Sequence, residues 1–117
     1  MKFFAATAAF AGLAAAAKIT DATIRDNNGI QMAQFTVDGV QCTASDAQLG
    51  SRQIACPGSA YSWHINGANS EYTLTLFKGV TSDAAGAYGK IPVVCTAGGN
   101  GPNDKVCDQT SEVTIDI

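Results

Sequence analysis

The chain has 117 residues, with seven Lys or Arg against ten Asp or Glu and a net charge of −3. This length fits one small domain. A net negative chain repels phosphate backbones and anionic lipids, so the composition argues against nucleic-acid binding and against membrane binding.

The first 17 residues have the pattern of a secretory signal peptide. Lys2 gives a positive start, an alanine-rich apolar stretch follows, and Ala15 and Ala17 place small side chains at the spacing that a signal peptidase accepts. The stretch is shorter than the roughly 20 apolar residues that span a bilayer. We therefore expect cleavage before Lys18 and a secreted, extracellular domain of residues 18–117, with six Lys or Arg, ten Asp or Glu and a net charge of −4.

Beyond Lys18, short runs of β-branched and aromatic residues alternate with polar ones, and no window has sustained helical spacing. Residues 26–29, Asp38-Gly39 and Asn66-Gly67 are turn signals, and the first two make the opening strands a meander of hairpins. The pattern predicts an all-β fold, a small antiparallel barrel or sandwich-like barrel. Its expected strands cover residues 19–25, 30–37, 40–44, 52–56, 61–65, 72–77, 88–95 and 112–117.

The alternation within the later strands assigns some side chains to faces. Trp63 is expected in the core, and His64 on the outward face. Phe77 lies on the outward face of its strand, where we expect the loop of residues 79–86 to bury it; the alternative is an exposed contact patch. Pro92 cannot donate to a strand ladder, which predicts an edge position or a bulge.

The mature part holds four cysteines, Cys42, Cys56, Cys95 and Cys107. An even count behind an export signal favours two disulfides, for which three pairings are possible. Local closure of each cysteine pair would remove about 3 kcal/mol of unfolded-state freedom in the chain-entropy model. Metal ligation is the weaker interpretation, because no Cys-x-x-Cys occurs and His64 is the only histidine. Neither a metal nor a cofactor is expected.

The segment from Cys95 to Cys107 reads Cys-Thr-Ala-Gly-Gly-Asn-Gly-Pro-Asn-Asp-Lys-Val-Cys, and its glycines and proline force a tight irregular loop. With Lys18-Ile19, Phe35-Thr36-Val37 and Cys42-Thr43-Ala44, this segment resembles the fungal family typified by the Alternaria alternata major allergen. That family is a β-barrel with two intramolecular disulfides, and its members include secreted elicitors of plant defence.

The resemblance implies pairing of Cys42 with Cys56 and of Cys95 with Cys107. It also bears on oligomeric state, because the allergen needs an additional cysteine upstream of the barrel for a covalent dimer. No cysteine lies between Lys18 and Gln41, so a covalent dimer is not expected here.

We expect a non-enzymatic effector or elicitor that binds a host extracellular protein in the plant apoplast. The resemblance suggests a thaumatin-like defence protein as the partner. Loops held by disulfides lose less entropy on binding, so the loops of residues 98–105 and 46–52 are the candidate contact surfaces. The candidate contact residues are Asn100, Asn103, Asp104, Lys105 and Tyr88.

Two other classes of function, a ligand-binding module and an enzyme, compete with protein recognition. A small-ligand or wall-polysaccharide binding module would use an aromatic side chain such as Tyr88. A secreted ribonuclease would depend on His64 with few arginines, and a glycosidase on Asp104 with Asp108 or Asp21 with Asp26. Acidic residues near turns are usually solvated, so no catalytic residue is assigned.

Overall fold

The computed structural model describes residues 16–117, and most of the expected signal peptide lies outside the described residues. The described chain forms two antiparallel sheets and two disulfides, which confirms the predicted all-β fold. No helix in this part of the chain is long and apolar enough to cross a membrane. The elements are β1 (Ala16–Asn27), β2 (Ile30–Val37), β3 (Val40–Ser45), α2 (Asp46–Leu49), β4 (Ile54–Ala55), β5 (Tyr61–Ala68), β6 (Glu71–Lys78), β7 (Gly86–Ile91), β8 (Val93–Ala97), β9 (Asp104–Gln109) and β10 (Val113–Asp116).

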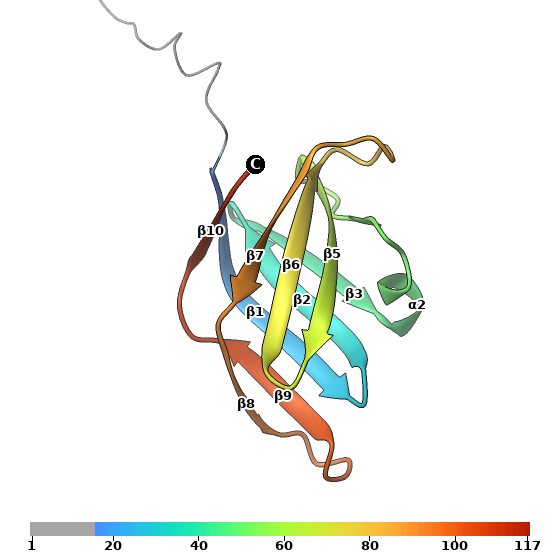
Figure 1. The fold of residues 1–117 in the computed structure, drawn as a ribbon, viewed down its shortest axis with the longest axis vertical. Coiled ribbons are helices and arrows are strands. Elements are labelled where there is room, and N and C mark those ends of the chain that lie inside the picture. Colours follow the sequence, from blue (N-terminus) through green and yellow to red (C-terminus); the bar gives the residue numbers. More distant parts are fainter. Residues whose placement is uncertain (1–15) are drawn as a thin grey trace, which may run out of the picture.

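The first sheet has the strand order β3-β2-β1-β9-β8, and β10 pairs with the first residues of β1. The second sheet has the order β4-β5-β6-β7 and lies across the first (Figure 1). The strands β1, β2 and β3 form the predicted meander of hairpins. The chain passes between the sheets after β3 and again between β7 and β8.

The core lies between the two sheets and contains the inward side chains of alternating strand positions. Trp63 is fully buried, as predicted, and its ring makes an edge-on contact with Phe35 at a centroid distance of 4.9 Å. Burying a large aromatic or aliphatic side chain stabilises the fold by roughly 1.5–3 kcal/mol. The other large, fully buried side chains are Tyr72, Ile19, Ile24, Leu74, Leu76, Ile115 and Val37.

Three strand predictions differ from the structure in their bounds. Residues 88–95 form not one strand but the end of β7 and the start of β8, because Pro92 has no N–H and the chain changes sheets there. β7 and β8 each lie at the edge of their sheet, which agrees with the edge position predicted from Pro92. The turn predicted at Asn66-Gly67 lies instead at Asn69 and Ser70, which have positive φ angles of 53° and 70°. β4 is reduced to two residues.

Two elements were not predicted. β9 begins at Asp104 inside the segment expected to be a loop, and only Val106 and Cys107 among its residues are apolar. α2 occupies part of the expected 46–52 loop, and a capping box between Ser45 and Gln48 closes its first turn. The Ser-x-x-Gln spacing was the sequence signal for this turn.

The first strand begins two residues before the expected cleavage site. Ala17 is fully buried and lies opposite Ile115 in the β1–β10 ladder. Cleavage before Lys18 would therefore remove a core side chain and two ladder positions of β1. This boundary remains a prediction.

Candidate functional site

The two disulfides have the expected pairing. Cys42 and Cys56 join β3 to the residue after β4, with a Cα–Cα distance of 5.1 Å, and so tie the two sheets together. Cys95 and Cys107 face each other across β8 and β9 with a Cα–Cα distance of 3.9 Å. The second disulfide closes the hairpin whose tip is the 98–103 loop.

The buried Asp104 side chain anchors the 98–103 loop. Its side chain is only 1% exposed, and its carboxylate accepts a hydrogen bond from the Asn100 N–H at 3.0 Å. The Arg25 guanidinium lies 3.3 Å from the same carboxylate. A Cβ on Gly98 would overlap the Asp104 carboxylate, so only glycine leaves room for this arrangement. The loop is therefore fixed by buried polar contacts as well as by the disulfide.

The predicted contact residues do not all lie on the surface. Asn100 and Asn103 are exposed at the loop tip, and Lys105 is half-buried in β9. Asp104 is buried, so its burial is compatible with a positioning role in the loop and not with direct contact to a partner. Tyr88 lies on β7 in the second sheet, not in the loop, and is 75% exposed, which is unusual for a side chain of its size.

A second buried carboxylate lies beneath the β5–β6 hairpin. The Tyr72 hydroxyl donates to Asp26 at 2.5 Å, and the Gly29 N–H donates to the other carboxylate oxygen at 2.9 Å. Burial and the hydrogen bond to Asp26 raise the pKa of Tyr72 well above its ordinary value of 10.0. Both groups are satisfied inside the fold, so we assign them a structural role.

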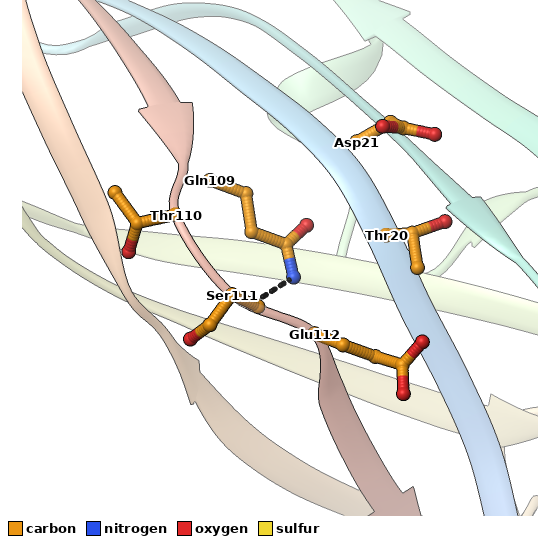
Figure 2. Close-up of a pocket in the computed structure, with 6 residues that line it drawn as sticks. All are labelled: Thr20, Asp21, Gln109, Thr110, Ser111 and Glu112. Atoms are coloured by element: carbon orange, nitrogen blue, oxygen red, sulfur yellow. Dashed lines mark hydrogen bonds between the residues drawn. The ribbon is translucent and has the colours of Figure 1, made fainter.

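Gln109 fills a gap in the first sheet. β1 pairs with β10 up to Ile19 and with β9 from Thr23 onward, and the register shifts in between. The Gln109 amide nitrogen donates to the Ser111 carbonyl at 2.7 Å (Figure 2) and to the Ile19 carbonyl at 2.9 Å. Its amide oxygen accepts the Ala22 N–H at 2.9 Å. One side chain thus replaces the missing ladder contacts.

A shallow hollow of about 220 Å³ lies over this gap. Its lining residues all have polar side chains and are drawn in Figure 2: Thr20, Asp21, Gln109, Thr110, Ser111 and Glu112. Within residues 16–117, no group of three or more His, Cys, Asp or Glu side chains is placed to hold a metal ion. The polar lining of the hollow is typical of a surface cleft filled by solvent.

Three of the four carboxylates considered for glycoside hydrolysis have contacts within the fold. Asp104 pairs with Arg25, whereas Asp108 accepts the Thr23 hydroxyl at 2.9 Å. Asp26 is buried under Tyr72. These three carboxylates thus serve strand pairing and loop structure.

The outward face of the second sheet carries the exposed aromatic surface. Phe77 is half-buried, and its ring lies against Gly86 on the neighbouring strand, where a Cβ would come within 2.9 Å of it. Tyr88 is the diagonal neighbour of Phe77 on the same face, because the ladder pairs Phe77 with Gly86 and Thr75 with Tyr88. A hollow of about 180 Å³ adjoins Phe77 and is lined by Arg52, Gln53, Phe77 and Ser82.

Comparison with known proteins agrees with this architecture. Two solved structures of the Alternaria alternata allergen Alt a 1 match the fold. The first has a TM-score of 0.67 and 25% identity and covers 86% of this chain and 85% of the allergen. The second has a TM-score of 0.66 and 23% identity, with coverage of 86% and 90%. No curated protein matches the sequence.

The family model described as Alternaria alternata allergen 1 matches residues 19–107, which include both disulfides and all or most of every strand except β10. The matched range covers well over half of the chain. The protein therefore belongs to the Alternaria alternata allergen 1 family.

Proposed function

We propose that the protein is a secreted, non-enzymatic effector or elicitor that binds a host extracellular protein. The observation that carries this proposal is the fixed, exposed tip of the 98–103 loop. Residues 99–103 are exposed, while the buried Asp104 carboxylate and the Cys95–Cys107 disulfide hold the two ends. A loop that is ordered before binding loses less entropy when it contacts a partner.

The two disulfides are consistent with an extracellular protein, because such bonds persist in oxidising compartments. The family contains an allergen, and among residues 16–117 no catalytic constellation supports an enzymatic alternative better than recognition. A plant defence protein of the thaumatin-like class is the partner that we propose to test first. Asn100 and Asn103 would supply amide donors and acceptors at the centre of the contact.

Affinity capture from plant extracellular fluid tests the proposal. The oxidised protein is compared with a reduced and alkylated sample and with an Asn100→Ala/Asn103→Ala variant. Asn66→Ala is the matched control, because Asn66 is also exposed but lies on β5. We expect a specific host protein to be captured by the native and Asn66→Ala forms and lost with the other two. Equal capture by all four forms, or none by the native form, would contradict the proposal.

A second candidate function is binding of a wall polysaccharide or a flat small ligand. The exposed Tyr88 beside Phe77 favours this function, because aromatic rings stack on such ligands. Trp63 is fully buried and would report binding at this face poorly. The test is retention on insoluble wall polysaccharide, which Tyr88→Ala should reduce and Val80→Ala, at another exposed apolar residue, should not.

A further inference from the structure

β8 is an edge strand of the first sheet. It pairs with β9 on one side, and no other strand of the described chain pairs with it on the other side (Figure 1). An edge strand presents unpaired backbone N–H and C=O groups that can pair with another chain. β8 is five residues long and has no charged side chain along its length.

The hydrogen bonds at the two ends of β8 show which backbone groups face β9. The Thr110 N–H donates to the Pro92 carbonyl at 2.9 Å, and the Gly98 N–H donates to the Asp104 carbonyl at 2.9 Å. In an antiparallel ladder, every second residue makes such bonds. The intervening even-numbered positions, residues 94 and 96, therefore bond to β9.

The odd-numbered residues of β8 direct their N–H and C=O groups away from β9. These are Val93, Cys95 and Ala97. The short Cα–Cα distance of 3.9 Å between Cys95 and Cys107 agrees, because closely spaced antiparallel pairs are the ones without mutual hydrogen bonds. Within residues 16–117, no turn or loop hydrogen bond involves the backbone of these three residues, and β9 is the only strand that pairs with β8. Three N–H and three C=O groups are therefore open along this edge.

A hollow of about 380 Å³ lies at the start of the open edge. Its floor is apolar and comes from the passage between β7 and β8. Lys90 and Glu71 stand at its rim and form an exposed ion pair with each other at 3.3 Å, so the rim carries no net charge. The lining residues are Ser70, Glu71, Lys90, Ile91, Pro92 and Val93.

We propose that β8 binds an extended segment of a partner protein, which adds a strand to the first sheet and places an apolar side chain in this hollow. The inference rests on the proposed function, since it gives the mode by which a protein partner is recognised. Alternating donors and acceptors at the spacing of every second residue are the complement of another extended backbone. The apolar floor of Ile91, Pro92 and Val93 favours an apolar side chain over a charged one.

The opposite face of β8 supports the same occupant. Val94 is 59% exposed and is one of three large hydrophobic residues with high exposure among residues 16–117. An added strand would cover Val94 with side chains that alternate away from the hollow. One extended segment thus accounts for the open backbone groups, the hollow and the exposed valine.

The test uses ¹⁵N chemical-shift mapping of the full mature protein with synthetic peptides. The probes are acetylated, amidated heptapeptides of alternating Thr and Ser with Leu, Phe or Tyr at the central position. We expect saturable shifts at residues 93–97 and at Lys90. An aspartate at the central position should weaken binding about fivefold or more, and methylation of every backbone nitrogen of the peptide should abolish it.

Protein variants give a matched comparison. Ala97→Pro removes an open N–H without removing a bond to β9 and should raise the Kd about fivefold. Ala97→Ser retains the N–H and should leave the Kd unchanged. If Ala97→Pro does not fold, as judged by circular dichroism, the N-methylated peptide with the native protein decides the same point.

No saturable shift at β8 with any of the three central residues would overturn the inference, as would equal binding of the N-methylated peptide. Shifts at β8 that depend on the concentration of the protein alone would also overturn it, because they identify a second copy as the occupant. Host-protein capture without peptide binding at β8 would defeat this inference and leave the proposed function standing. Peptide binding at β8 without capture of any host protein would contradict the proposed host partner and leave this inference standing.

Discussion

The Arg25 guanidinium lies 3.3 Å from the Asp104 carboxylate, although the two residues are 79 positions apart in the chain. The Asp104 side chain is 1% exposed and that of Arg25 is 36% exposed. The same carboxylate accepts the Asn100 N–H. One buried acid therefore fixes the 98–103 loop to the middle of the first sheet.

Removal of this acid should loosen the loop and the sheet together. Asp104→Ala leaves the Asn100 N–H and the Arg25 guanidinium without their acceptor, so we expect the free energy of unfolding to fall by about 2 kcal/mol. Urea unfolding measures the loss, and limited proteolysis should show faster cleavage within residues 98–103. Asp108→Ala is the control, because Asp108 is exposed and accepts only the Thr23 hydroxyl. Equal losses in the two variants would show that burial of Asp104 is unimportant.

Gln109 should be more important for stability than its polar character suggests. Gln109→Ala removes hydrogen bonds to the Ile19 carbonyl and the Ala22 N–H, which lie at the break between the β1–β10 and β1–β9 ladders. We expect a loss of about 1–3 kcal/mol in the free energy of unfolding. Ser111→Ala keeps the Ser111 carbonyl that Gln109 contacts and should change stability little. Hydrogen exchange at the Ala22 amide is the local measurement, and unchanged protection in Gln109→Ala would refute the assignment.

Alternation of apolar and polar residues was sufficient to predict most of the fold. It placed Trp63 in the core and the first three strands in one meander, because side chains on a half-buried sheet must alternate. β9 was missed because the buried Asp104 and the half-buried Gln109 are polar residues in positions where an apolar pattern is expected. The β1 partners of these two residues lie about 80 to 90 positions away in the chain, so no local sequence pattern reveals the pairing.

The candidate site was predicted less completely than the fold. The disulfide-closed loop and the exposure of Tyr88 could be inferred from glycine, proline and cysteine positions. The burial of Asp104 and the open edge of β8 could not, because both depend on which strands become neighbours. Pro92 was the one sequence signal for that edge, since proline is confined to edges and bulges.

Ionisation of Tyr72 should lower the free energy of unfolding at alkaline pH. Burial and the hydrogen bond to Asp26 raise the pKa of Tyr72 in the folded state, so above about pH 10 the unfolded chain loses the proton while the folded chain retains it. The stabilisation is complete below about pH 10 and is lost as the pH rises toward the folded pKa. Burial also raises the pKa of Tyr61, with Asp38 as a second cause, and contributes in the same direction.

Chemical unfolding between pH 8 and pH 11.5 measures this effect. Tyr72→Phe should be less stable than the native protein at pH 8, because Asp26 loses a buried donor, and its stability should decline less steeply above pH 10. Tyr88→Phe, at an exposed position, is the matched control. Identical slopes for the native and Tyr72→Phe proteins would exclude Tyr72 as the cause.

The two disulfides should protect different parts of the chain. Replacement of either pair by serine should lower the free energy of unfolding by about 2–5 kcal/mol. Cys95 and Cys107 lie in strands that remain paired without the bond, whereas the Cys42–Cys56 bond ties a two-residue β4 to the first sheet. Mass-spectrometric mapping of limited proteolysis should therefore show new cleavage within residues 46–60 only in the Cys42→Ser/Cys56→Ser variant. Cleavage there in both variants would contradict the assignment.

The start of the mature chain should affect stability measurably. A chain that begins at Ala16 keeps the buried Ala17 and its ladder position opposite Ile115, whereas a chain that begins at Lys18 lacks both. Loss of one small buried side chain and of adjacent ladder contacts should lower the free energy of unfolding by about 1–2 kcal/mol. Guanidinium unfolding of the two purified forms gives this difference, and the intact mass of the secreted protein identifies the natural start. Because the β1–β10 ladder runs through Ala17, equal stability of the two forms would show that its first two pairs contribute nothing to the fold.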